Sequence, residues 1–278
     1  MNQTSILIKL GGTAASSVAA LEALADDLVA APGTIAIVHG GGKEVSELSR
    51  RFGLEPVFHN GVRMTSEAEM DAVEMVLSGV ANKRLVRRLS KRGLPAVGIS
   101  GADAGLLVGT RVPDPAGALS RTATIASVNP KLVRDLWSAG YVPVISSPGS
   151  DANGEAVNIN ADDAAFALAG ALEVGSLLFV SDVPGVIIEN EPVVSLTPAM
   201  AAAGIGTEQI SGGMVPKVQN AITALAHGVA QVVIGNYERT GDLRLLLEGK
   251  RGTAIVAEDS GTAPNPRKQE GSTHDGNE

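Results

Sequence analysis

Three polar side chains that could contact a ligand, Asn158, Asn160 and Asp162, lie close together in the sequence. An almost purely apolar segment follows over 161–172 and predicts a helix that is too apolar to face water on any side. Amide and carboxylate groups at the start of a helix can simply cap its free backbone N–H groups. The start of so apolar a helix lies at the edge of a buried layer, however, and ligands of open α/β sheets bind at that edge. The segment therefore indicates either a helix cap or a ligand site.

Two glycine-rich turns offer a second chemistry, the binding of an anion. Leu10-Gly11-Gly12 and His39-Gly40-Gly41-Gly42 each end an apolar run and lead into a helical pattern. Glycine lets backbone N–H groups approach an anion closely, and a helix start adds a favourable partial charge. Lys9 stands directly before the first turn, and a lysine in an apolar strand is costly to bury unless its charge is used. The turns indicate a phosphate or carboxylate site, although a tight connection from strand to helix would use the same residues.

The composition and the remaining motifs exclude several classes of protein. The chain has 278 residues, a net charge of -8 and no cysteine, which excludes disulfides and thiol nucleophiles and argues against non-specific nucleic-acid binding. It contains neither the phosphate-loop motif G-x-x-x-x-G-K-[ST] nor the G-x-S-x-G motif of α/β-hydrolases, and its four histidines offer no metal-ligand pairing. No signal peptide and no apolar run of about 18 residues are visible. We expect a cytoplasmic protein that binds neither nucleic acid nor membrane.

The elements that position these residues follow from the alternation of apolar and helical patterns. Strands are predicted at 5–10, 35–38, 96–99, 142–146, 176–180, 232–235 and 253–256. Helices are predicted after each glycine-rich turn, over 130–140, 161–172 and 214–227, near Thr197 and near Leu243. Uninterrupted apolar strands that alternate with helices predict an α/β fold with a mostly parallel sheet, covered by helices on both faces.

The segments between the predicted strands and at the end of the chain also give local predictions. The stretch 57–64 is expected to form a small excursion, and Ser66-x-x-Glu69 is a capping-box pattern that begins a long helix ending near Gly93. The basic residues between 83 and 92 fall at helical spacing and predict a solvated helix face. The glycine- and proline-containing stretch up to about Arg121 is expected to form loops or a hairpin, and the polar segment 258–278 a disordered tail.

An ordered set of motifs covers nearly the whole chain up to Val256. The motifs are Lys9-Leu10-Gly11-Gly12, His39-Gly40-Gly41-Gly42, Asn60-Gly61-Val62-Arg63-Met64-Thr65, Asn82-Lys83, Asn158-Ile159-Asn160-Ala161-Asp162, Ser181-Asp182-Val183-Pro184-Gly185 and Gly212-Gly213-Met214-Val215-Pro216-Lys217. Together they resemble the amino-acid kinase family. The resemblance implies a three-layer αβα sandwich around a mostly parallel sheet. It also implies an N-terminal lobe, 1–175, for the acyl amino acid and dimerisation, and a C-terminal lobe, 176–257, for ATP.

The same resemblance implies transfer of the γ-phosphoryl group of ATP, carried with Mg²⁺, to the side-chain carboxylate of N-acetyl-L-glutamate in arginine biosynthesis. Lys9 and Lys217 would contact the transferred group, and Asp162 would position both lysines. The substrate-binding residues implied are Gly41, Gly42, Arg63, Asn158 and Asn160. The nucleotide-binding residues implied are Gly11, Gly12, Ser181, Asp182, Val183, Gly185, Gln209, Ile210, Ser211 and Gly213.

This assignment agrees with the residue chemistry. A carboxylate nucleophile is already ionised at neutral pH, so the reaction needs no general base, and two lysines with glycine amides and Mg²⁺ can offset the repulsion between two anions. The planar fork of Arg63 suits an α-carboxylate, although the residue could also be a surface arginine in a turn. Lys217 could likewise be a helix-surface lysine, but Gly212-Gly213 directly before it favours a phosphate contact.

Two alternatives to this substrate and activity stay open. The family's G-x-V-G hairpin is replaced here by Gly117-Ala118-Leu119-Ser120 after Gly101-Ala102-Asp103-Ala104-Gly105. Because that loop lies near the acyl pocket in relatives, a carrier-protein-linked aminoadipate or glutamate of lysine biosynthesis is a second candidate substrate. A binding or regulatory protein on the same fold is a further alternative, which the presence of Lys9, Asp162 and Lys217 disfavours.

Assembly is the last expectation. Arginine-inhibited members of the family carry an extra N-terminal helix that interlaces dimers into a hexamer, whereas only Met1 to Thr4 precede the first predicted strand here. The predicted helix from Ser66 to about Arg92 offers a face for pairing two subunits, as it does in the family. We therefore expect a homodimer that arginine does not inhibit.

Overall fold

The computed structural model describes residues 5–11, 17–59, 61–189 and 191–257. A central eight-stranded sheet runs in the order β14-β16-β15-β11-β1-β2-β8-β5. Neighbouring strands are parallel except for β15 and β16, which are antiparallel, so the predicted α/β fold with a mostly parallel sheet is confirmed. The strands are β1 Ser5–Leu10, β2 Thr34–His39, β5 Ala96–Ser100, β8 Val142–Ser146, β11 Ser176–Val180, β14 Ser195–Leu196, β15 Gln231–Gly235 and β16 Thr253–Val256.

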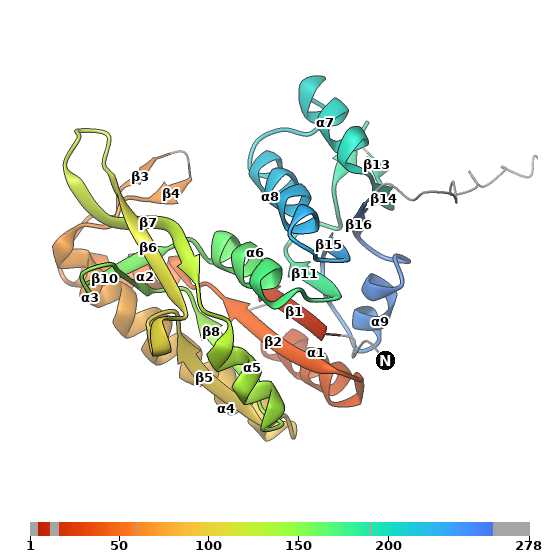
Figure 1. Cartoon of the computed structure of the whole chain (residues 1–278), viewed down its shortest axis with the longest axis horizontal. Coiled ribbons are helices and arrows are strands. Elements are labelled where there is room, and N and C mark those ends of the chain that lie inside the picture. Colours follow the sequence, from red (N-terminus) through yellow and green to blue (C-terminus); the bar gives the residue numbers. More distant parts are fainter. Residues whose placement is uncertain (1–4, 12–16, 60, 190, 258–278) are drawn as a thin grey trace, which may run out of the picture.

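Helices cover both faces of this sheet because successive side chains of a buried strand point to opposite sides. In β1, Leu7 packs in one core cluster with α5–α8, while Ile6 and Ile8 pack in another with α1, α4 and α9. Figure 1 shows α6 in the middle of the molecule, over β1 and β11. The helices are α1 Val18–Ala30, α4 Asn82–Lys91, α5 Lys131–Ser138, α6 Ala161–Leu172, α7 Pro198–Gly206, α8 Met214–Ala226 and α9 Asp242–Leu247.

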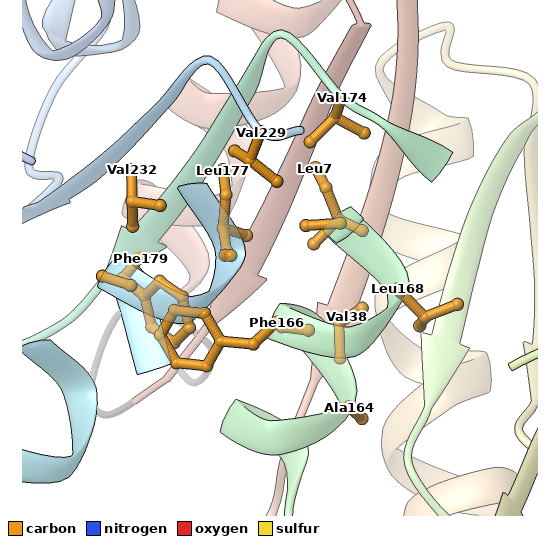
Figure 2. Packing of buried hydrophobic residues seen from close by; sticks show 14 of the residues in the cluster. Leu7, Val38, Ala164, Phe166, Leu168, Val174, Leu177, Phe179, Val229 and Val232 are labelled. Carbon is orange, nitrogen blue, oxygen red and sulfur yellow. The ribbon is translucent and has the colours of Figure 1, made fainter. Parts of the chain in front are cut away.

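The core beneath α6 holds this helix against the central strands. Phe166 of α6 stacks on Phe179 of β11 with 4.4 Å between ring centroids. Leu168 and Leu177 are fully buried in the same core cluster (Figure 2). Such an aromatic pair adds to the free energy of area burial and fixes the helix against the strand. The first turn of α6 is thereby held over the carboxyl ends of the central strands.

A long helical stretch confirms the predicted capping box in part. It consists of α3 Glu67–Glu74, a π-helical segment η1 Met75–Ala81, and α4. The Glu69 N–H donates to Ser66 Oγ at 3.2 Å, which is the predicted cap. The Glu69 carboxylate, however, is 3% exposed and accepts hydrogen bonds inside the protein. A preceding helix, α2 Gly42–Arg51, packs against α3.

A small closed barrel was not foreseen from the sequence. Its strands are β6 Leu107–Pro113, β7 Leu119–Val128, β9 Gly149–Asp151 and β10 Ala156–Ile159. The predicted hairpin within the stretch up to Arg121 is confirmed as β6–β7, and it follows a short 3₁₀ turn at Asp103–Gly105. The predicted excursion is the hairpin β3 Phe58–His59 and β4 Val62–Arg63. Both hairpins project on the same side of the molecule (Figure 1).

The sheet passes without a break through the predicted lobe boundary, since β11 begins at Ser176 and pairs with β1. A further hairpin, β12 Ile187–Ile188 and β13 Glu191–Pro192, precedes β14. The predicted tail at 258–278 lies outside the described residues. Within the described part of the chain, no helix is both long and apolar enough to cross a membrane.

Candidate active site

Two lysines converge on one carboxylate at the carboxyl edge of the sheet. Lys9 comes from the end of β1, Asp162 from the first turn of α6 and Lys217 from the first turn of α8. The Lys9 Nζ lies 2.6 Å from Asp162 Oδ1, and the Lys217 Nζ lies 2.5 Å from Asp162 Oδ2. The Lys217 ammonium also lies 5.7 Å from the centre of the Phe179 ring. Residues far apart in the sequence thus form one compact cationic group.

The charges of the two lysines determine whether the Asp162 carboxyl is protonated or ionised. Burial by itself would raise the pKa of this carboxyl, but the charges of Lys9 and Lys217 outweigh burial and hold the pKa below its ordinary value. Asp162 is therefore ionised at neutral pH. One carboxylate between two ammonium groups leaves a net positive charge, which suits an incoming anion.

Capping and ion pairing belong to different residues at the start of α6. Asn160 is the N-cap, and its Oδ1 accepts a hydrogen bond of 2.7 Å from the Asp162 N–H. The carboxylate of Asp163 accepts from Asn220 of α8 at 3.0 Å. Burial and then the charge of Asp162 raise the pKa of Asp163. The sequence left open whether this segment caps the helix or binds a ligand. In the structure, Asn160 caps α6 and Asp162 pairs with the two lysines.

A cavity of about 470 Å³ opens beside Lys9 and Asp162. The residues singled out from the sequence that line it are Lys9, Gly11, Gly41, Gly42, Arg63, Asn158, Asn160 and Asp162. Further lining residues, which the sequence did not single out for the site, include Lys43, Glu44, Phe58, Leu77, Arg84, Thr122 and Ser147. The cavity therefore unites the two glycine-rich turns, Lys9 and Asp162 of the cationic group, and the barrel, while Lys217 lies outside its lining.

The glycine-rich turns are closely packed at two positions. A Cβ on Gly11 would lie 2.7 Å from Lys9 Nζ, and a Cβ on Gly41 would lie 2.8 Å from Leu77 Cδ2. Contacts this short exclude a side chain unless its neighbours move. Both glycines line the cavity, so their backbone forms part of its wall. Gly12, which the family resemblance assigns to the nucleotide, lies outside the described residues.

His39 supports the second turn and stays neutral. Its Nδ1 lies 3.0 Å from the Gly40 carbonyl oxygen, which can only accept, so Nδ1 carries the proton. Its Nε2 then accepts from Asn82 Nδ2 at 3.1 Å. Burial, as the largest cause, lowers the pKa of His39 to about 4. The histidine at this turn is thus a buried structural partner of the backbone.

The guanidinium of Arg63 is buried in the cavity wall. Its Nη1 donates to Glu69 Oε1 at 2.6 Å, and its Nη2 donates to Ser46 Oγ at 2.6 Å and to the Gly42 carbonyl at 2.9 Å. The group also lies 4.7 Å from the centre of the Phe58 ring. Both hydrogens of Nη2 therefore have acceptors within the protein. A bidentate grip on a ligand carboxylate would require an exchange of one of these partners.

Gly11 lines the cavity, whereas the other described residues assigned to the nucleotide lie at the same edge of the sheet, outside the cavity lining given above. Ser181, Asp182, Val183 and Gly185 follow the end of β11, where the Ser181 N–H donates to the Gly235 carbonyl at 2.9 Å. Gln209, Ile210 and Ser211 form the turn between α7 and α8, and Gly213 directly precedes α8. Ile210 as a whole is 2% exposed, packs in the core cluster that contains Phe179, and donates its N–H to the Gly204 carbonyl at 2.9 Å. A nucleotide contact is therefore a prediction for its neighbours Gln209 and Ser211 more than for Ile210 itself.

An ion pair on the cavity wall had no signal in the sequence. Arg84 Nη2 of α4 donates to Glu44 Oε1 of α2 at 2.6 Å, and both side chains line the cavity. The sequence interpretation of the basic run as a solvated face is therefore wrong for Arg84, which is partly buried. The two residues come from different helices, and only the folded chain brings them together.

Comparison with known proteins gives a consistent result. The model of the amino acid kinase family matches residues 4–236. The chain is 38% identical to an acetylglutamate kinase of Rubrobacter xylanophilus over 253 residues, covering 91% of this chain and 97% of the relative. It is 42% identical to an acetylglutamate kinase of Geobacillus stearothermophilus over 200 residues, covering 72% of this chain and 77% of the relative. The fold is shared with a carbamate kinase of Giardia lamblia bound to AMP-PNP, with a TM-score of 0.66, 15% identity, and coverage of 92% of this chain and 99% of the other.

Proposed function

The chain belongs to the amino acid kinase family, and we propose that it transfers the γ-phosphoryl group of ATP to the side-chain carboxylate of N-acetyl-L-glutamate, a step of arginine biosynthesis. The observation that carries the proposal is the pairing of Lys9 and Lys217 with Asp162 beside the cavity. The name acetylglutamate kinase on the curated relatives favours this substrate over a carrier-linked amino acid.

The chemistry follows from the charges at the site. A carboxylate oxygen of the substrate attacks the γ-phosphorus, a new O–P bond forms, and the bond from the γ-phosphorus to the bridging oxygen of ADP breaks. The nucleophile needs no deprotonation because it is already ionised. The ammonium groups of Lys9 and Lys217 donate to the oxygens on which negative charge accumulates, and Asp162 holds both groups in place.

Mg²⁺ usually enters such reactions on the nucleotide phosphates with few protein ligands, and there it neutralises phosphate charge. Among the residues that the structure describes, no group of three His, Cys, Asp or Glu side chains could hold a metal ion. ATP as the phosphoryl donor is supported by the family and by the AMP-PNP bound to the Giardia protein of the same fold.

Each side of the site would bind one of the two substrates. Gly41 and Gly42 at the start of α2, together with Arg63, Asn158 and Asn160, would hold the acyl amino acid. The segments after β11 and before α8 would hold the nucleotide, with Gly11 beside Lys9 between the two substrates. All cavity-lining residues precede the proposed boundary at 175, which supports an acyl-binding N-terminal lobe and an ATP-binding C-terminal lobe. Dependence on ATP supports a cytoplasmic location.

The direct test is an ATP- and Mg²⁺-dependent acyl-phosphate assay with hydroxylamine trapping. We expect N-acetylglutamate to give the highest kcat/KM among N-acetylglutamate, glutamate, aspartate and carrier-linked aminoadipate. A higher kcat/KM for a carrier-linked substrate would support the lysine-biosynthesis alternative. Absence of hydroxamate with every substrate would contradict a kinase of carboxylates.

Replacing Arg63 by lysine should weaken the binding of the acyl amino acid selectively. A lysine cannot reproduce the contacts of the guanidinium with Glu69 and Ser46, nor a planar grip on a carboxylate. We expect the KM for N-acetylglutamate to rise by about tenfold or more, with the KM for ATP within about twofold, since hydrogen bonds to charged groups are stronger than neutral ones. The exposed Arg50→Lys is the control. Equal weakening of both substrates, or of neither, would contradict the assignment of Arg63.

We also propose a homodimer that pairs through the long helix. Met75 and Val80 on η1 are 53% and 59% exposed, an apolar face that a second subunit could cover. Light scattering should give about twice the 28.2 kDa chain mass. Replacing both residues by glutamate should give monomers, whereas Val29→Glu on α1, also exposed, should leave the dimer intact. A wild-type hexamer or monomer would refute the proposed dimer.

A further inference from the structure

Two buried threonines lie at the acyl end of the cavity, Thr122 in its wall and Thr65 next to it, and nothing in the proposed mechanism uses them. Thr65 follows β4 and is 0% exposed, while Thr122 lies on β7 of the barrel and is 4% exposed. We propose that this pair orients Arg63 and Asn158 toward the acyl amino acid, so that Thr65 and Thr122 are positioning residues that set affinity for the N-acylated substrate. The inference rests on the proposed function of the cavity.

The hydroxyl of Thr122 fixes the backbone that carries Arg63. Its Oγ1 donates to the Arg63 carbonyl at 2.6 Å and accepts from the Thr65 N–H at 2.8 Å. One hydroxyl thus satisfies both a backbone acceptor and a backbone donor of the segment after β4. The Arg121 N–H also donates to the Thr65 carbonyl at 2.8 Å. The end of the β3–β4 hairpin is therefore tied to the barrel at the Arg63 carbonyl and at both backbone groups of Thr65.

The hydroxyl of Thr65 fixes the side chain of Asn158. The Asn158 Nδ2 donates to Thr65 Oγ1 at 2.8 Å. Asn158 is also opposite Thr122 in the pairing of β10 with β7, so the same barrel register places all three residues together. A carboxamide is planar with its oxygen and nitrogen on opposite sides. Holding Nδ2 on Thr65 therefore turns Oδ1 away from this threonine.

This orientation indicates what Asn158 would recognise. Asn158 lines the cavity, and its Oδ1 can only accept a hydrogen bond. A ligand with a single amide N–H beside its carboxylate, as in an N-acylated amino acid, supplies the matching neutral donor. If the amide of Asn158 could rotate freely, it would present a donor and an acceptor with equal ease, and this preference would be lost.

The test replaces Thr65 by valine, which has nearly the same shape but cannot accept a hydrogen bond. We expect the KM for N-acetylglutamate, and its Kd by calorimetry, to rise by about tenfold, with kcat and the KM for ATP within about twofold, because only one buried hydrogen bond is lost. Thr65→Ser keeps the hydroxyl and should restore the wild-type KM. Thr124→Val, at an exposed position of the same strand β7, is the control and should match the wild type.

A double-mutant cycle separates positioning from general damage to the fold. If Thr65 acts through Asn158, then Thr65→Val should add nothing to the KM of Asn158→Ala. Thr122→Val should show the same selective rise in KM, together with a lower melting temperature, because it leaves the Arg63 carbonyl and the Thr65 N–H without their partner.

The outcomes distinguish this inference from the proposed function. A wild-type protein that neither binds nor phosphorylates N-acetylglutamate refutes the proposed function, and the inference with it. An active wild type with an unchanged KM in Thr65→Val refutes the inference alone. Additive effects in the cycle, or an equal rise in the KM for ATP, also refute it, because the loss would then not pass through Asn158.

Discussion

Replacing Lys9 or Lys217 by alanine is expected to lower kcat by about 10²-fold or more, since removing one donor to a developing anion typically costs that much. Each ammonium lies within 2.6 Å of an Asp162 oxygen and at the edge of the sheet where the two substrates would meet. The KM values should change less than kcat, because the donors matter most when charge accumulates on the transferred group. Steady-state kinetics with the hydroxamate assay measures both quantities.

Lys131→Ala provides the control for this prediction. Lys131 lies on the surface of α5, where its side chain is 75% exposed and pairs with Asp135. Loss of such an exposed pair changes little, so its kcat should match the wild type. If Lys9→Ala and Lys217→Ala also kept kcat within a few-fold of the wild type, neither lysine would contact the transferred phosphoryl group.

Asp162→Asn is the second large effect expected, with a loss in kcat of about 10²-fold if the placement of the lysine donors depends on this carboxylate. An amide has the shape of the carboxylate but lacks its charge, and one of its two ends is a donor that would face an ammonium group. Both lysines would then lose their ionic partner. Asparagine serves about as well as aspartate near a helix start, so a purely capping role would leave kcat unchanged.

A matched control lies at the next residue. Asp163→Asn removes the same charge from the same helix turn, but Asp163 pairs with Asn220 instead of with a lysine. Interaction of the charge with the helix dipole is thus lost equally in both variants. We expect Asp163→Asn to keep kcat within a few-fold of the wild type. Equal losses in the two variants would assign the effect to the helix start and not to the lysine contacts.

The secondary structure of the central sheet could be predicted from local pattern. The helix at Ala161–Leu172 and the strand at Ser176–Val180 agree with the expected bounds. A continuous apolar run between a polar cap and a glycine leaves few local alternatives, and alternation of such strands with helices determines a parallel sheet. The barrel escaped prediction because β9 and β10 have only three and four residues and take their identity from distant partners.

The capping box shows how tertiary contacts override a local rule. Ser66 caps α3 as predicted, because that bond joins residues three positions apart. The carboxylate of Glu69 instead pairs with the buried guanidinium of Arg63. A buried charge without a partner costs far more than an unfilled position at a helix end, so the ion pair prevails. The sequence contains both residues but not the fact that they are buried together.

The sequence by itself determined which residue types could bind anions and where the chain would turn: Lys9 beside glycines, Asn160 and Asp162 at a helix start, Lys217 after a glycine pair. These signals are local, since they depend on neighbours within a few positions. Only the tertiary structure decided which groups meet, including Arg84 with Glu44 and Thr65 with Asn158. Each of those contacts joins elements separated by many residues, and its existence depends on how strands pair and helices pack, which no local pattern records.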